Sequence, residues 1–353
     1  MTDQHQTASL AIPYAWQQQQ WQRVCQLSAN HQLPHALLLA GPKGIGKRHF
    51  AQAVGYLMLC LSPVNQVPCG SCKGCELNRA ETHPDLFVLA PEDGSRVIKI
   101  DQVRRLTDFI AKTSQQGGRK VAVIEPVEAL NINAANALLK SLEEPSGDSL
   151  LLLVSHMPSQ VMATIRSRCQ QLEFPMPDQE QSLSWLTPLS VGQDAGYLLA
   201  CSGGAPLKAL ELLEGDALEQ RELLAKGLLA LAGHHISALE LAAKLQSGDP
   251  LTVVESVMHW LQQGLRIQGQ AQDQPTEQVS EQDNQLQQLL ASVPSQILFR
   301  FWDKLVSLKR QLLSAANPNK QLLLEELMMD WQALARQSSQ ASESRQRLVN
   351  GLI

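Results

Sequence analysis

Four short apolar runs mark the first half of the chain. They are residues 36–40 (ALLLA), 86–89 (LFVL), 120–125 (KVAVIE) and 150–155 (LLLLVS). Segments with apolar residues at helical spacing lie between them, for example Val103, Leu106 and Ile110. Runs that are apolar on both faces and alternate with helices predict a parallel sheet covered by helices on both sides. The first part of the chain is therefore expected to have an α/β fold.

The pattern changes after Pro175 and Pro177. From there on, Leu- and Ala-rich segments have helical spacing, interrupted by a turn at residues 202–206 (SGGAP), and none of them resembles a strand. Residues 268–283 (QGQAQDQPTEQVSEQD) are rich in Gln and poor in large apolar side chains, which is typical of a mobile loop. The sequence therefore predicts an all-helical second part that contains one long polar loop.

Composition agrees with a globular protein of more than one domain. The 353 residues predict two or three domains, and the 44% hydrophobic content is ordinary. No apolar run approaches the ~20 residues that span a bilayer, and the first residues lack the pattern of a secretory signal, so we expect a cytoplasmic protein without a membrane segment. The net charge of −5 argues against a broad DNA-binding surface on this chain alone.

Residues 41–48 read GPKGIGKR and lie between the first predicted strand and a helical segment. This is the setting of a phosphate-binding loop, in which backbone N–H groups and the helix dipole attract phosphate and the Lys reaches its outer groups. Gly41, Gly44, Gly46 and Lys47 fit that pattern. A chance Gly-rich turn is the plainer alternative, and the order of strand, loop and helix disfavours it.

Two features that such a site needs for magnesium are missing. The residue after the Lys is normally Ser or Thr, which ligates Mg²⁺, but Arg48 has no lone pair to offer and adds a positive charge. At the end of the third predicted strand, Glu125 is one methylene longer than the usual Asp, and the following Pro126 cannot polarise water. We therefore expect that this chain does not hydrolyse ATP, while weak nucleotide binding stays open.

A cluster of cysteines between residues 60 and 75 (CLSPVNQVPCGSCKGC) indicates a metal site rather than disulfides in a cytoplasmic chain. Four thiolates can complete a tetrahedral zinc site with no open position, so we expect structural zinc on Cys60, Cys69, Cys72 and Cys75. Free thiols are one alternative. A zinc ribbon that binds nucleic acid is another, disfavoured because Lys73 and Arg79 are the only basic residues nearby.

Four features occur together in a fixed order: LPHALLLAGPKGIGK (33–47), the cysteine spacing, NALLKSLEEP (136–145) and IRSRC (165–169). With them the chain resembles the delta-prime family of subunits of the bacterial DNA polymerase III clamp loader, which are AAA+ proteins. The phosphate loop alone is common, whereas SLEEP and SRC together are specific to clamp-loader AAA+ proteins. The resemblance extends from about Trp16 to Trp331.

This resemblance implies three domains. They are an AAA+ P-loop domain (1–176) with an inserted zinc module (60–75), a small helical lid (177–215), and an all-α collar (216–353) that contains the Gln-rich loop (268–283). In this family the collar joins gamma or tau and delta subunits in a hetero-pentamer, which loads the sliding clamp at primer–template DNA. The complex is part of a DNA-directed DNA polymerase holoenzyme, a nucleotidyltransferase, and the delta-prime subunit is the one that does not hydrolyse ATP.

The resemblance also assigns a role to Arg168, the Arg of SRC, as a finger that acts on the ATP of the neighbouring subunit. A permanently charged, planar guanidinium suits phosphate oxygens. Arg166 is the alternative finger, and the plainer interpretation of Arg168 is a surface side chain or an ion pair with Glu173. Leu207 and Lys208 stand where AAA+ ATPases often carry a sensing Arg, so this nucleotide contact is expected to be weak or missing.

Two other functions compete with this interpretation. An active AAA+ ATPase with unusual metal ligation would hydrolyse ATP with Mg²⁺ as an isolated chain. A zinc-dependent DNA-binding protein would bind DNA by itself, with an affinity that falls steeply with salt. The acidic charge balance disfavours the second of these. Within the SLEEP segment, Lys140 and Glu143 are candidates for contact with neighbouring subunits.

Overall fold

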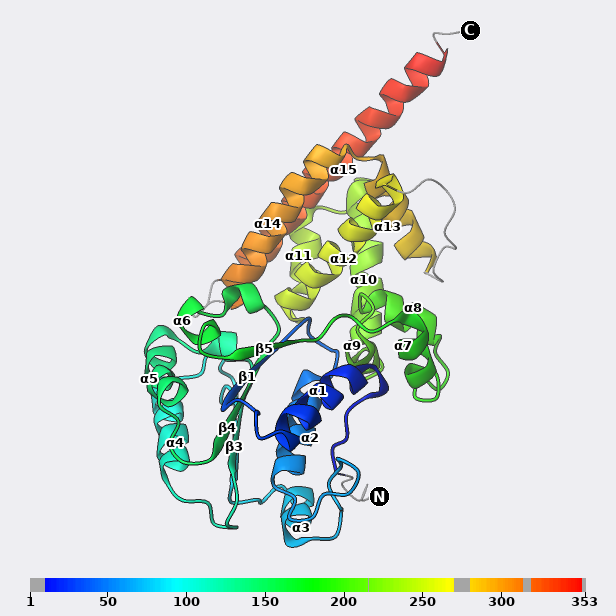
Figure 1. Ribbon diagram of the computed structural model, residues 1–353. Helices are drawn as coiled ribbons and strands as arrows, with labels where there is room; N and C mark the ends of the chain where they lie inside the picture. The colour runs from blue at the N-terminus through cyan, green and yellow to red at the C-terminus, as the bar shows by residue number, and fades with distance from the viewer. Residues whose placement is uncertain (1–9, 215, 270–279, 314–318, 351–353) are drawn as a thin grey trace, which may run out of the picture. The chain divides into compact units, whose positions relative to one another are not determined.

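The structure is a computed structural model that describes residues 10–214, 216–269, 280–313 and 319–350. The chain divides into two compact units, residues 1–182 with 205–208, and residues 183–204 with 209–353. The first unit contains the sheet, and the second is helical (Figure 1).

The first unit contains a five-stranded sheet in the order β2-β3-β4-β1-β5, with all paired strands parallel. Its strands are β1 (Ala36–Ala40), β2 (Leu86–Leu89), β3 (Lys120–Ile124), β4 (Ser149–Ser155) and β5 (Gln170–Glu173). Its α-helices are α1 (Gln18–Ala29), α2 (Lys47–Met58), α3 (Lys73–Arg79), α4 (Ile100–Ala111), α5 (Ile132–Glu143) and α6 (Ala163–Arg166). Three short 3₁₀ helices are η1 (Ala15–Gln17), η2 (Val127–Ala129) and η3 (Pro158–Gln160).

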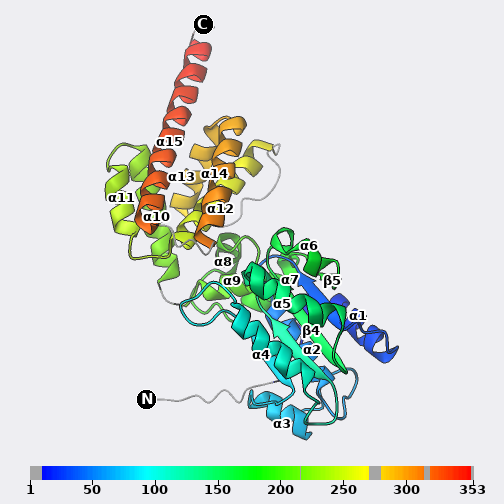
Figure 2. The same cartoon turned by 90° about the vertical axis from the view of Figure 1, so that its left-hand side faces the viewer.

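The central strands are buried on both faces because helices cover both sides of the sheet. Leu37 and Leu39 of β1 pack with α1 and α2, whereas Leu38 packs with α4 and α5 on the opposite face. Figures 1 and 2 show these two helical layers on either side of the strands. The expected α/β fold with a parallel sheet is confirmed.

Strands β1 to β4 correspond to the four apolar runs in the sequence, and β5 was not predicted. Its sequence, QQLE, is mostly polar, and three of its four residues are exposed. It pairs with β1 at the edge of the sheet, where hydrogen bonds to one neighbour suffice and a polar surface blocks further pairing. An edge strand of this kind lacks the hydrophobic pattern that identifies central strands.

Loop 112–118 returns the chain from α4 to β3 over a buried carboxylate. Asp85 is 1% exposed and accepts hydrogen bonds from the backbone N–H groups of Gln115 (2.8 Å) and Gln116 (2.9 Å). The Lys120 ammonium lies 4.0 Å from the same carboxylate and donates to the Phe109 carbonyl oxygen at 2.9 Å. These contacts satisfy a buried ion pair and fix the position of the loop.

The second unit confirms the predicted helical second part. Its helices are α8 (Ala195–Cys201), α10 (Ala217–Ala232), α11 (Ala238–Leu245), α12 (Pro250–Gly269), α13 (Glu281–Ser292), α14 (Ser295–Leu313) and α15 (Lys320–Asn350). Helices α7 (Gln179–Leu186) and α9 (Pro206–Glu211) each have residues in both units. Most of the predicted Gln-rich loop, residues 270–279, lies outside the described residues.

Two fully buried tryptophans form the centre of the second unit. The Trp331 indole donates to the Leu228 carbonyl oxygen at 3.0 Å, and the Trp260 indole donates to the Asp283 carboxylate. Arg221 pairs with the same carboxylate at 3.1 Å and stacks on the Trp260 ring. The indole N–H groups and the Asp283 carboxylate are therefore paired, whereas Arg221 Nε is buried without a hydrogen-bond partner in the part of the chain that the structure describes. The boundaries of the three-domain division after residues 176 and 215 stay a prediction.

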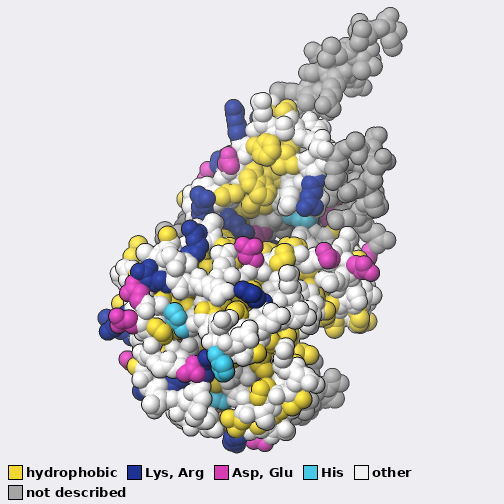
Figure 3. All heavy atoms as spheres, viewed as in Figure 1, with side chains coloured by type: hydrophobic (Ala, Val, Ile, Leu, Met, Phe, Trp, Pro, Cys, Tyr) yellow, Lys and Arg dark blue, Asp and Glu magenta, His cyan; other side chains and the backbone are white. Residues whose placement is uncertain are grey.

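The surface agrees with the modest net charge. On the face that Figure 3 shows, Lys and Arg side chains are interspersed with acidic, apolar and uncharged surface and do not merge into one stripe. Among the described residues, no helix combines the length and the apolar character needed to span a bilayer.

Candidate functional site

The predicted phosphate-binding loop connects β1 to α2, which is the position that the sequence indicated. Gly44 (φ 81°) and Gly46 (φ 85°) adopt left-handed conformations that side chains other than glycine rarely take. A Cβ on Gly46 would lie 2.6 Å from the Tyr14 ring, and one on Gly41 would lie 2.2 Å from the Phe174 carbonyl oxygen. Close approach of the chain therefore requires glycine at these positions.

Neighbouring segments of the first unit hold the loop in place. The Trp16 indole and the Gln17 amide both donate to the Ile45 carbonyl oxygen, each at 3.0 Å. The backbone N–H of Leu207 donates to the Gly44 carbonyl oxygen at 3.0 Å. Lys208 is also close, because its Cβ would lie 2.8 Å from a Cβ on Gly44. The loop thus keeps its shape through contacts within the chain.

Lys47, the lysine of the loop, is 2% exposed. Its ammonium donates to the Pro42 carbonyl oxygen at 2.5 Å, within the same loop. Burial lowers the pKa of Lys47 to about 8, although the carboxylates of Glu128 and Glu125 act in the opposite direction. This cation is therefore poorly solvated, and a nearby anion would stabilise it.

Arg48 lies where the sequence placed it, at the second residue of α2, and pairs with Glu125 at the end of β3. Its Nε is 3.4 Å from Glu125 Oε2; the Arg48 side chain is 57% exposed and that of Glu125 is 13% exposed. Burial raises the pKa of Glu125, and Arg48 and Lys47 counteract that effect. The loop and the carboxylate are thus linked by a guanidinium. In a P-loop NTPase a magnesium ion mediates this link.

Glu128 and His156 join this group, and sequence reasoning missed both. Glu128 Oε1 accepts hydrogen bonds from the backbone N–H groups of His156 (2.8 Å) and Met157 (3.1 Å). The His156 imidazole lies 3.6 Å from Glu125, but burial, together with Lys47, lowers its pKa to about 3, so the ring is neutral near pH 7. Both residues follow the carboxyl ends of adjacent strands, a position that could have identified them.

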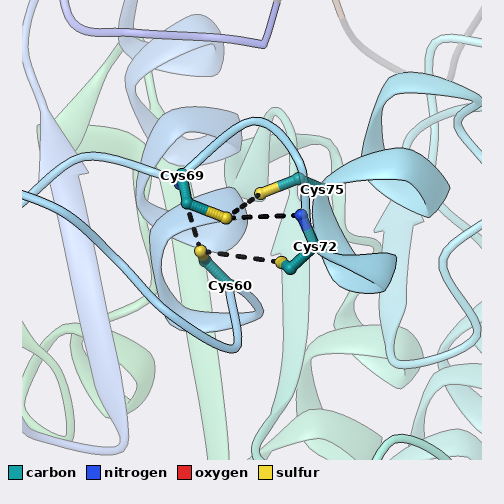
Figure 4. Close-up of side chains that lie close together, drawn as sticks. All are labelled: Cys60, Cys69, Cys72 and Cys75. Atoms are coloured by element: carbon teal, nitrogen blue, oxygen red, sulfur yellow. Dashed lines mark hydrogen bonds between the residues drawn. The ribbon is translucent and has the colours of Figure 1, made fainter.

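The four predicted cysteine ligands come together in one cluster (Figure 4). Cys60 follows α2, Cys69 and Cys72 lie on the next loop, and Cys75 lies in α3. All four sulfur atoms are within 4.8 Å of one another. The distances are 3.8 Å from Cys60 to Cys72 and 3.9 Å from Cys69 to Cys75, well beyond the ~2.05 Å of a disulfide.

These distances fit a tetrahedral metal ion. Zn–S bonds of ~2.3 Å place the sulfur atoms of a tetrahedral site ~3.8 Å apart. Backbone N–H groups of Cys69 and Cys72 donate to cluster sulfurs at 3.2 and 3.4 Å, which favours thiolates. Hydrogen bonds, above all from the Ser62 hydroxyl, lower the pKa of Cys69 to about 5, whereas burial raises that of Cys75 to about 12. A cation would help Cys75 to lose its proton.

Arg168 lies between α6 and β5 and is partly exposed (34%). Its Nη2 is 2.5 Å from Glu143 Oε1, and its Nη1 donates to the Thr164 carbonyl oxygen (2.9 Å) and the Ser167 hydroxyl (3.4 Å). Its acidic partner is therefore Glu143 and not Glu173. The alternative finger, Arg166, is the exposed last residue of α6.

Two family models match the chain: "DNA polymerase III, delta subunit" over residues 16–178 and "DNA polymerase III, delta subunit, C terminal" over residues 215–333. DNA polymerase III subunit delta′ of Pseudomonas aeruginosa is 41% identical over 92% of this chain and 99% of that protein. The Escherichia coli subunit delta′ is 33% identical over 84% of this chain and 88% of that protein.

Among solved structures, a DNA polymerase III gamma subunit-related protein from Thermotoga maritima matches 90% of this chain and 99% of that chain. The two are 18% identical and superpose with a TM-score of 0.40. The sequence relatives decide the family, because they are at least 33% identical over most of their own length. The chain belongs to the delta′ subunits of DNA polymerase III.

Proposed function

We propose that this chain is a non-hydrolysing subunit of the DNA polymerase III clamp loader, which helps to load the sliding clamp onto primed DNA. It would assemble with gamma or tau and delta subunits and act within the polymerase holoenzyme. Membership of the delta′ family supports this role, because the 41% identical relative is matched over 99% of its length. The two family models cover parts of both compact units.

The ion pair between Arg48 and Glu125 is the observation that carries the non-hydrolysing part of the proposal. Arg48 offers no oxygen to a magnesium ion, and its charge repels one. Pro126 cannot take a proton from water or orient it. The loop glycines and Lys47 keep an anion-binding shape, so the fold of a nucleotide site is retained without the groups that drive hydrolysis.

We also propose that Arg168 acts on the ATP bound by a neighbouring subunit. Its guanidinium is partly exposed, stands in the connection between α6 and β5, and is anchored by the nearby Thr164 carbonyl. A charged, planar side chain at an exposed position can bind phosphate oxygens of a molecule held by another chain.

The cysteine cluster is proposed to hold one structural zinc ion. The four sulfur atoms fit tetrahedral coordination and leave no position for a substrate or water. When bound, zinc would offset half of the charge of the four thiolates and link α2, the following loop and α3. The residues themselves set the geometry through the short turns between Cys69, Cys72 and Cys75.

The test of the finger is the substitution Arg168→Ala in a reconstituted clamp-loader complex. We expect the complex to assemble and ATP turnover at the site that receives Arg168 to fall by ~10³-fold or more, the low end for such fingers. Arg166→Ala is the matched control, two residues away, and should retain turnover. Unchanged turnover with Arg168→Ala, or the same loss with Arg166→Ala, would remove Arg168 from this role.

A further inference from the structure

Glu143 ends α5 in the SLEEP segment, and Arg168 follows α6 in the SRC segment, 25 positions later. The fold places Glu143 Oε1 2.5 Å from Arg168 Nη2. We propose that Glu143 is a positioning residue for Arg168: it holds the guanidinium in a resting orientation and yields it to a phosphate group of the neighbouring subunit's nucleotide. This inference rests on the proposed role of Arg168 as a finger.

Glu143 is suited to this role because it connects Arg168 to a different helix. The other hydrogen-bond partners of the guanidinium, the Thr164 carbonyl and the Ser167 hydroxyl, belong to the same short segment as Arg168. They can stay bonded when that segment moves. Among the contacts of the described residues, the carboxylate of Glu143 alone ties the guanidinium to α5. Breaking it frees Nη2 to bind a phosphate oxygen, while Nη1 stays anchored to the Thr164 carbonyl.

The exposure of the pair makes this contact easy to exchange. The Arg168 side chain is 34% exposed and that of Glu143 is 49% exposed. Water screens such pairs, and they contribute little to stability. A nucleotide phosphate carries more charge and presents several acceptor oxygens, so it competes well for the same guanidinium. A carboxylate that stayed beside that phosphate would repel it. The contact between Glu143 and Arg168 should therefore break when Arg168 binds the phosphate.

The adjacent carboxylate provides a matched control. Glu144 is exposed, has the same charge and follows Glu143 directly, at the C-cap of α5. No ion pair joins it to Arg168 among the described residues. Glu143→Gln and Glu144→Gln therefore remove the same charge from the same helix end. Only Glu143→Gln also removes the ion pair with Arg168.

The experiment compares ATPase kinetics of reconstituted complexes that carry Glu143→Gln, Glu144→Gln, Arg168→Ala or Glu143→Gln with Arg168→Ala. Weakening a half-exposed ion pair should lower the half-saturating ATP concentration by ~2- to 5-fold. It should leave kcat unchanged, because the cost of breaking the contact with Glu143 is met when ATP binds and is the same in the bound ground state and in the transition state. Glu144→Gln should match the wild-type complex. In the Arg168→Ala background, Glu143→Gln should have no effect.

Three outcomes would overturn the proposal. They are equal kinetics for Glu143→Gln and Glu144→Gln, a Glu143→Gln effect that persists without Arg168, and a fall in kcat with Glu143→Gln. The last would mean that Glu143 supports the engaged finger instead of retaining it. Failure of the proposed function appears separately, as normal turnover of the complex with Arg168→Ala alone.

Discussion

The side chain at position 48 places a cation of the chain's own beside the predicted phosphate-binding loop. A hydroxyl there would ligate magnesium, whereas Arg48 brings its own charge and places it 3.4 Å from Glu125. Lys47 is already buried beside it, with a pKa lowered to about 8 by burial. A divalent ion would add its charge to two cations that already offset the carboxylates of Glu125 and Glu128. We therefore propose that the loop keeps a fixed conformation and does not turn over ATP.

His156 gives this site a dependence on pH. The folded protein holds the imidazole neutral down to a pKa of about 3 because of burial, whereas the unfolded chain takes up a proton near 6.5. The unfolded state binds more protons between these values, so stability rises with pH and is lost as the pH falls from about 6.5 toward 3. The free energy of unfolding should therefore decrease less steeply with falling pH in His156→Gln, by up to ~1.4 kcal/mol per pH unit.

Unfolding free energies from urea titrations at pH 4, 5, 6 and 7 check this expectation. The exposed His31 lies on a left-handed turn (φ 56°), and His31→Asn preserves that conformation and serves as the control. If the free energy of unfolding falls with pH equally in the wild-type and His156→Gln chains, His156 does not cause the pH dependence of stability.

At the scale of elements, the helices, strands and clusters with a pattern of their own in the sequence could be predicted. The four central strands were predictable because both faces are buried and the runs are wholly apolar. The cysteine cluster was predictable because tight spacing on turns brings ligands together. Edge strand β5 was not, and neither were the contacts of His156 with Glu125 and of Glu143 with Arg168. These depend on which elements become neighbours, and no local pattern encodes that.

The fold of the cysteine-rich segment, residues 60–75, is expected to depend on a bound metal ion. Cys60, Cys69, Cys72 and Cys75 are spread over a helix end, a loop and the start of α3, so one bound ion would join three separate pieces of backbone. We expect one zinc per chain by elemental analysis, and Cys72→Ser should lose the metal because three thiolates bind it much more weakly than four. Cys201→Ser should retain it. A metal-free native preparation would contradict the assignment.

At the scale of the whole molecule, the family match covers both compact units and not only the loop and the cysteine cluster. The relatives align with 84% to 92% of the chain, and the family models match residues 16–178 and 215–333. This coverage is what we expect of a delta′ subunit, and it is consistent with the proposal that Arg168 acts on ATP held by another subunit.

The most direct measurement is the release of phosphate from ATP by the isolated chain in the presence of magnesium. The Lys47→Ala variant, purified in parallel, gives the background from contaminating ATPases. We predict the same release from both proteins, and a rise in turnover when the wild-type chain is mixed with the other clamp-loader subunits. Magnesium-dependent release by the isolated chain that Lys47→Ala abolishes would contradict the account.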